Sequence, residues 1–181
     1  IHVANETAQT ANLMIELTAL RDGRIKVLTA RRDLDLAPRQ RHTVAASDLI
    51  GSFFDISYAY RFQPAQHDAT VARLIDRKTG SVLSETVHFP QGHSGSVAEA
   101  DLSATLAQDD RGWRLDIVAE RLARFVHIVD DHFTPDDDFF HLPPGRTHTV
   151  RLAPRRGTSE RPSGAVRALN LIAPLRYRSL P

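Results

Sequence analysis

The sequence predicts an all-β protein, with two immunoglobulin-like antiparallel β-sandwiches in tandem. Apolar residues recur with a period of two along most of the 181 residues, which is the period of a strand with one buried face. Turn signals built from Gly, Pro, Asn and Asp interrupt the alternation at short intervals, giving about seven strands in each half. A stretch without large apolar residues, Pro90–Ser96, separates the two halves. We therefore predict one sandwich over residues 1–92 and a second over 93–181.

In the first half, Leu13, Ile15 and Leu17 share one face of a predicted strand, and Asp22-Gly23 is a hairpin turn signal. In the next predicted strand, RIKVLTARRDLDL, the apolar residues move from odd-numbered positions at its start to even-numbered positions at its end. This change predicts a bulge near Arg31-Arg32, where one extra residue would shift the alternation. The segment HTVAASDLIG predicts one short helix with Ser47 or Asp48 as its N-cap. Two further predictions follow in chain order: a strand over FFDISYAYRF, and a hairpin that turns at Lys78-Thr79-Gly80.

The second half repeats this rhythm. Trp113, Leu115 and Ile117 share a face of one predicted strand, and Pro144-Gly145 fits the central positions of a type II turn. The segment THTVRL alternates after that turn, and SGAVRALNLI predicts a last strand.

Composition excludes several kinds of site. The chain has no cysteine, so thiol nucleophiles, disulfides and zinc-thiolate sites are ruled out, and a cytoplasmic location is favoured over a periplasmic one. No apolar run reaches the roughly 20 residues that span a bilayer, and the start lacks the pattern of a signal peptide. Because the chain begins without Met, we interpret it as an excised piece whose targeting information is missing.

The basic residues are almost all arginines, a bias typical of a GC-rich, bacterial genome. They are scattered rather than striped, which disfavours nucleic acid as a partner. Residues 155–181 carry six arginines and one acidic residue, whereas residues 97–154 are acidic. This basic tail (about 155–181) is expected either to dock on a carboxylate surface or to form a loose Arg-rich end.

One motif resembles a known family. The stretch FVHIVDDHFTPDDDFFHLPPGRTHTVRL is similar to the C-terminal Ig-like domain of β-mannosidases of glycoside hydrolase family 2, in which a D-F-F-x-L-x-P-G stretch precedes a closing strand. The first half is similar to the preceding sandwich of those enzymes, through IHVANET and SYAYRF…VARLIDRKTGSVL. The matching residues of the second half are Phe133, Asp138, Phe139, Phe140, Leu142, Pro144, Gly145 and Val150.

The resemblance implies a function for the parent protein. In that family two catalytic glutamates lie on a β/α barrel that precedes these domains, and 181 residues without βα alternation do not hold such a barrel. The chain is thus expected to be a non-catalytic accessory part of a β-mannosidase-like glycosidase, with the barrel of the same polypeptide and, through it, carbohydrate as partners. No catalytic residue and no cofactor is expected. The alternatives are an exo-β-glucosaminidase parent and a free-standing carbohydrate-binding or adhesive Ig-like module.

Two groups of residues are candidate binding sites. Asp136, Asp137 and Asp138 are weak candidates for a calcium site, because hard cations take clustered carboxylate oxygens. Their spacing does not fit a D-x-D-x-D-G loop, so turn capping is the favoured interpretation and no metal is predicted.

Aromatic residues form the second group. Tyr58 and Tyr60, within a cluster that also contains Phe53, Phe54 and Phe62, could stack on a sugar. Large rings more often fill sandwich cores, so core or interdomain packing is the favoured prediction. Phe139 and Phe140 are likewise possible sugar or interdomain contacts, and they are adjacent in the sequence. If that segment is extended, one ring is expected in the core and the other over an edge or an interface.

Overall fold

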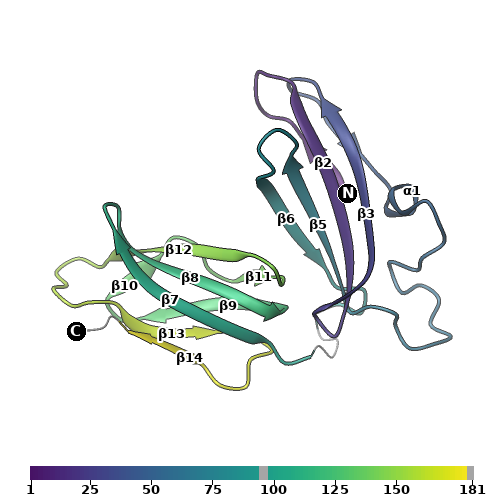
Figure 1. Ribbon diagram of the computed structural model, residues 1–181. Coiled ribbons are helices and arrows are strands. Elements are labelled where there is room, and N and C mark those ends of the chain that lie inside the picture. The colour runs from purple at the N-terminus through teal and green to yellow at the C-terminus, as the bar shows by residue number, and fades with distance from the viewer. Residues whose placement is uncertain (94–97, 179–181) are drawn as a thin grey trace. The chain divides into compact units, whose positions relative to one another are not determined.

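The computed structural model describes residues 1–93 and 98–178, and it divides the chain into two compact units, Ile1–Ser96 and Val97–Pro181 (Figure 1). Regular structure within these ranges is antiparallel β apart from a single short helix, which confirms the predicted fold class. Part of the predicted linker, residues 94–96, lies outside the described residues. No helix of the described residues is long and apolar enough to cross a membrane.

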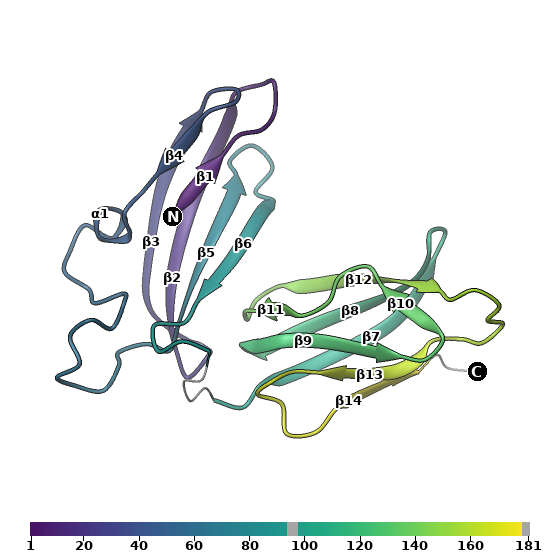
Figure 2. The ribbon, with the colours of Figure 1, turned by 180° about the vertical axis from the view of Figure 1, so that it is seen from behind.

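The first unit contains a four-stranded sheet and a two-stranded sheet, seen from both sides in Figures 1 and 2. The larger sheet has the order β3-β2-β5-β6, and the smaller sheet pairs β1 with β4. Its elements are β1 (His2–Ala4), β2 (Ala11–Arg21), β3 (Ile25–Leu36), β4 (Arg41–Thr43), α1 (Ala46–Ile50), β5 (Ala69–Asp76) and β6 (Val82–His88).

The core of this unit lies between the two sheets. Leu13, Ile15 and Leu17 alternate along β2 and are buried, as their parity predicts. They pack with Val3 of β1 and Leu49 of α1. The helix is where the sequence predicts it, but Ser47 and Asp48 lie inside it; the N-cap is Ala45, which makes no side-chain cap hydrogen bond.

The first hairpin follows the Asp22-Gly23 signal. Both residues have positive φ, 54° and 64°, the conformation that a type I′ turn requires. The bulge, however, lies at Val27 and not near Arg31-Arg32, because Ala19 pairs with Leu28 whereas Leu20 pairs with Lys26. The parity change is therefore absorbed close to the tight turn, where the extra residue accommodates the twist of the hairpin.

The other face of the large sheet carries a row of charges. Glu16 of β2 is buried and lies 2.6 Å from a guanidinium nitrogen of Arg31 on β3. Arg73 of β5 lies between Glu16 and Glu85 of β6, at 3.7 Å and 2.5 Å. The row crosses all four strands, so buried Glu16 and partly buried Glu85 each lie beside an arginine of a neighbouring strand.

The second unit is a sandwich of two four-stranded sheets, ordered β10-β12-β8-β7 and β11-β9-β13-β14. The core between them includes Leu115 and Ile117 of one sheet and Val126, Ile128 and Val166 of the other. The strands are β7 (Asp101–Asp109), β8 (Gly112–Arg121), β9 (Ala123–Asp130), β10 (Phe133–Pro135), β11 (Phe140–Leu142), β12 (Thr147–Pro154), β13 (Ser163–Arg167) and β14 (Leu175–Arg178).

The described part of the basic tail is folded rather than loose. It contains β13, within the predicted last strand, and β14, which the sequence did not predict. Tyr177 of β14 is buried, and its hydroxyl donates to the Asp130 carboxylate at 3.2 Å. Burial, with the nearby Asp130 charge, raises the pKa of the Tyr177 phenol well above its ordinary value. The tail is thus anchored through a tyrosine that crosses the sheet.

Candidate functional site

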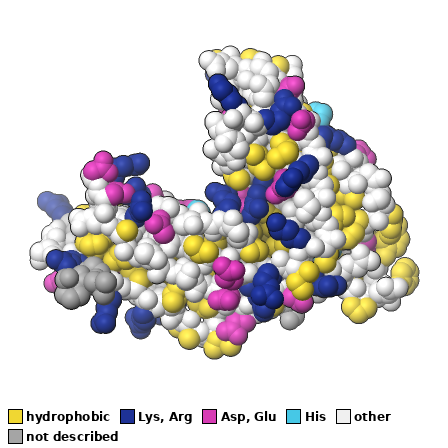
Figure 3. Space-filling view, viewed as in Figure 1, with side chains coloured by type: hydrophobic (Ala, Val, Ile, Leu, Met, Phe, Trp, Pro, Cys, Tyr) yellow, Lys and Arg dark blue, Asp and Glu magenta, His cyan; other side chains and the backbone are white. Residues whose placement is uncertain are grey.

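The most exposed apolar surface of the first unit is a loop of residues 51–66, here termed the aromatic loop. It contains the segment predicted as a strand, FFDISYAYRF, and that prediction is wrong: the segment forms bends and turns between α1 and β5. Of the two kinds of packing predicted for these rings, packing in the core is wrong for Phe53, Tyr60 and Phe62, which are 82%, 58% and 90% exposed, and interdomain packing stays a prediction. Hydrophobic side chains protrude on the side of the unit where this loop lies (Figure 3).

The loop is shaped by one carboxylate within it. Asp55 accepts hydrogen bonds from the backbone N–H groups of Ala59 at 2.9 Å and Tyr60 at 2.8 Å. Tyr58 has a φ of 53°, a left-handed conformation that breaks any strand. Partial loss of water raises the pKa of Asp55, but these two N–H groups and the Ser57 hydroxyl more than offset this, so the pKa is lowered overall. A local Asp turn therefore overrides the strand propensity of the rings.

His67 anchors the end of this loop. It is 2% exposed, its Nε2 donates to the Ile56 carbonyl at 3.2 Å, and its ring lies against Phe54 with the centroids 5.1 Å apart. Burial lowers the pKa of His67, and nearby His88 lowers it further. The Ile56 carbonyl and Asp55 raise it in part, but the pKa remains below its ordinary value.

The first unit is therefore expected to lose stability in mild acid. A depressed His pKa means that the unfolded chain binds the proton more readily, so the contribution is complete above about pH 6.5 and is lost as the pH falls below it. Urea unfolding at pH 8 and pH 5 would measure this. His67→Gln keeps a donor for Ile56 but cannot titrate, and it should lose less stability between the two pH values. Equal losses in both proteins would contradict the assignment.

A hollow opens within the aromatic loop. Tyr58 is half-buried, and its hydroxyl donates to the Gln63 carbonyl at 3.3 Å. The ring of Phe53 meets that of Tyr60 edge to face, with centroids 5.6 Å apart. The lining residues are Phe53, Asp55, Tyr58, Tyr60, Phe62, Gln63, Pro64, Ala65 and Gln66. Apolar ring faces beside side-chain amides are suited to a ligand that is apolar on one face and hydroxylated at its edge.

The three candidate metal ligands of the second unit, Asp136, Asp137 and Asp138, bind different groups. Asp136 accepts from the backbone N–H of Arg151 at 2.7 Å, and Asp137 lies 2.9 Å from Nε2 of His148. Asp138 accepts from the N–H of Ile128 at 2.9 Å and from Nδ1 of His127 at 2.8 Å. The carboxylates tie the 136–139 turn to strands of both sheets, and no group of three acidic or histidine side chains in the described residues could hold a metal ion.

The side chains of Phe139 and Phe140 have different surroundings, as predicted, although the backbone is not extended there. Phe139 has a φ of 58° and is exposed, and its ring stacks on His127 with centroids 4.5 Å apart and planes 11° apart. Phe140 is partly buried against the core, and its ring lies 4.0 Å from that of His148. Phe139 thus adds an exposed ring to the second unit, while Phe140 belongs to its interior.

Comparison with known proteins identifies the second unit. Residues 97–172 match the model of the mannosidase Ig-fold domain. They form a mannosidase-type Ig domain. The resemblance of the D-F-F-x-L-x-P-G stretch is thereby confirmed, since the turn of residues 136–139 and strands β11 and β12 lie inside this mannosidase-type Ig domain. No curated protein matches the chain.

Solved structures extend the likeness of fold to both units. A β-D-mannosidase from Dictyoglomus thermophilum aligns with 94% of this chain at 15% identity and a TM-score of 0.67. An exo-chitosanase from Amycolatopsis orientalis aligns with 98% at 14% identity and a TM-score of 0.62. The chain covers 20% and 25% of those two proteins. It therefore has the fold of a minor, all-β portion of a much longer glycosidase.

Proposed function

We propose that this chain is a non-catalytic C-terminal part of a β-mannosidase-like glycoside hydrolase that removes β-linked mannose from glycans. The supporting observation is the match of residues 97–172 to the mannosidase Ig-fold domain. The partner of both units is then the catalytic barrel of the same polypeptide, and carbohydrate is bound through the parent enzyme. An exo-β-glucosaminidase is the alternative parent, supported by the similarity to the exo-chitosanase.

Three carboxylates of low exposure, those of Glu16, Glu85 and Asp130, are suited to scaffolding rather than turnover. A retaining glycosidase needs two carboxyl groups about 5–5.5 Å apart, one of them free to attack the sugar. Here Glu16 and Glu85 share Arg73, and buried Asp130 accepts hydrogen bonds from N–H and O–H groups on all sides. These three carboxylates link neighbouring strands, and each oxygen of Asp130 already accepts two hydrogen bonds.

Hydrolysis assays on the parent enzyme and on residues 1–181 test the proposal. The parent should release p-nitrophenol from the β-mannoside, whereas residues 1–181 should not exceed a buffer blank. A parent that cleaves only the β-glucosaminide would establish the alternative parent. Hydrolysis by residues 1–181 alone, or a parent inactive on both glycosides, would overturn the proposal.

The aromatic loop favours one second candidate, a carbohydrate-binding module. Its specific support is the hollow, where Tyr58 and Tyr60 lie beside side-chain amides. Manno-oligosaccharides titrated into residues 1–181 should then give a saturable NMR shift that Tyr58→Ala or Tyr60→Ala abolishes. Leu83→Ala, another exposed apolar residue of the same unit, is the matched control. No shift at millimolar sugar would remove this candidate.

A further inference from the structure

The small sheet of the first unit has an unpaired edge on β1. In the described part of the chain, β1 pairs with β4 alone, with His2 opposite Thr43 and Ala4 opposite Arg41. Ile1 and Val44 exchange hydrogen bonds in both directions, at 2.9 Å each, and the N–H of Asn5 donates to the Gln40 carbonyl. Hydrogen-bonded pairs alternate in an antiparallel ladder, so odd-numbered residues of β1 bond to β4. The backbone groups of His2 and Ala4 consequently point to the other edge.

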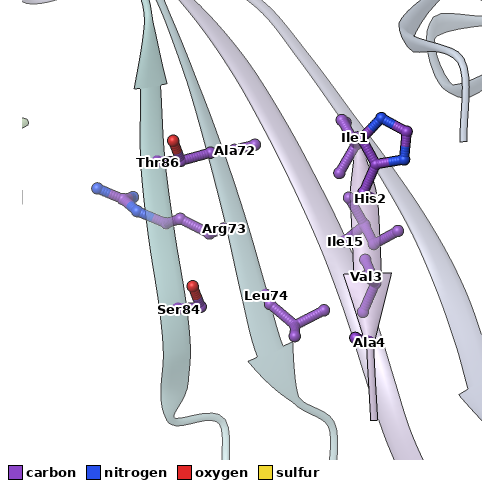
Figure 4. Close-up of a pocket in the computed structure, with 10 residues that line it drawn as sticks. All are labelled: Ile1, His2, Val3, Ala4, Ile15, Ala72, Arg73, Leu74, Ser84 and Thr86. Atoms are coloured by element: carbon purple, nitrogen blue, oxygen red, sulfur yellow. The ribbon is translucent and has the colours of Figure 1, made fainter. Parts of the chain in front are cut away.

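A groove runs along that edge. The side chains of Ala72 and Leu74 point from β5 toward β1, while Arg73 between them points the opposite way (Figure 4). Ile15 completes an apolar floor, β1 forms one wall, and Ser84 and Thr86 of β6 lie on the far side. Ala72 and Leu74 are only partly buried although they belong to the core face of the sheet. The small sheet therefore leaves part of the face of β5 and β6 uncovered.

The two units differ at this place. In the second unit each sheet has four strands, whereas in the first a four-stranded sheet faces two strands of three residues each. An immunoglobulin-like sandwich has at least seven strands, in sheets of four and three. One strand added at the edge of β1 would give this number and would lie over β5 and β6, since neighbouring strands are about 4.8 Å apart.

We propose that the groove holds one further β-strand, supplied by the polypeptide that precedes Ile1 in the parent enzyme. The strand hydrogen-bonds to the N–H and C=O groups of His2 and Ala4 and places alternate apolar side chains on Ile15, Ala72 and Leu74. Ile1 itself lines the groove, so a short turn before it brings the preceding residues back along β1. The inference rests on the proposed function only in that a longer polypeptide precedes this chain.

The occupant is a strand rather than a small molecule because the groove offers a backbone edge beside an apolar floor. An open edge of unpaired N–H and C=O groups is a template for another extended chain. Ser84 and Thr86 make its outer side polar, which suits the solvent-facing backbone of a single added strand. A second copy of this chain is the competing occupant, and it would join edge to edge through β1.

Hydrogen exchange tests the proposal on two proteins: residues 1–181, and the same chain lengthened at its N-terminus by 20 residues of its own coding sequence. The amides of His2 and Ala4 should exchange at least tenfold more slowly in the longer protein, and the unfolding midpoint of the first unit should rise by about 5 °C. Unchanged exchange in a folded longer protein would overturn the proposal, whether or not the parent enzyme cleaves mannosides.

Ala4→Pro gives a matched control, because proline removes the N–H that points into the groove and leaves the pairing with β4 intact. It should cancel the gain in the longer protein and leave residues 1–181 unaffected, since no hydrogen bond is lost there. Slow exchange of both amides in residues 1–181, together with concentration-dependent dimerisation in sedimentation, would instead establish a second copy as the occupant.

Discussion

Asp130→Asn is expected to destabilise the second unit by about 3 kcal/mol, or about 15 °C in its unfolding midpoint. Asp130 is 5% exposed, and its carboxylate accepts from the N–H groups of His132, Phe133 and Ser163 at 2.9–3.0 Å and from the Tyr177 hydroxyl. An amide has one acceptor oxygen. Its nitrogen would face the Ser163 N–H, leaving a buried donor without an acceptor.

Thermal unfolding followed by circular dichroism measures this effect. Asp131→Asn, the same change at the exposed neighbouring position, should shift the midpoint by less than about 2 °C. Tyr177→Phe removes one of the four donors and should cost about 1 kcal/mol. Similar midpoints for Asp130→Asn and Asp131→Asn would show that the Asp130 carboxylate does not hold β9, β13 and β14 together.

Gly164→Ala is expected to cost about 3 kcal/mol or more for a steric reason. Gly164 of β13 pairs with Asp130 on one side and with Tyr177 on the other. A Cβ there would lie 2.2 Å from the Val129 carbonyl oxygen and 2.7 Å from the Tyr177 hydroxyl oxygen. The missing side chain is what allows the tyrosine to lie over β13 and reach a carboxylate two strands away.

Denaturant unfolding would check the Gly164→Ala variant, with Ser163→Ala as the control at the exposed position beside it. If the variant also carries Tyr177→Phe, the double variant should lose less stability than the sum of the two single losses, because the hydroxyl oxygen at 2.7 Å is then gone while the ring carbon at 2.9 Å and the Val129 carbonyl oxygen remain. A Gly164→Ala protein as stable as the Ser163→Ala protein would contradict the packing described here.

The sequence predicted strands best where several apolar residues alternate along one buried face. Leu13, Ile15 and Leu17 alternate because polar neighbours face the other way, and the Asp22-Gly23 turn fixes the hairpin that joins β2 to β3. The bulge at Val27 could not be located, because a parity change says only that a residue is extra and not where it is. β14 was missed because its four residues contain a single buried side chain, Tyr177.

The candidate site was harder to predict for a related reason. Segments rich in aromatic residues have a high propensity for strands. Here the Asp55 carboxylate instead accepts hydrogen bonds from backbone N–H groups of its own loop, and a propensity scale for single residues does not include such a contact. The acidic stretch Asp136–Asp138 was correctly associated with turns, but which strand each carboxylate contacts depends on the tertiary fold. The sequence therefore drew attention to both segments, and the tertiary fold determines which partners their side chains contact.

The aromatic loop draws its shape from Asp55 and His67 and not from the ladder of either sheet. The rings at Phe53, Tyr60 and Phe62 contribute almost nothing to the core, so substitutions there leave the sandwich intact. Changes in the number of rings on this face are thus expected to carry little penalty in folding. The sandwich and the aromatic loop are therefore separable, as the sandwich and the binding loops of antibodies are. Residues between Gly51 and Gln66 are accordingly a place where new contacts could be engineered.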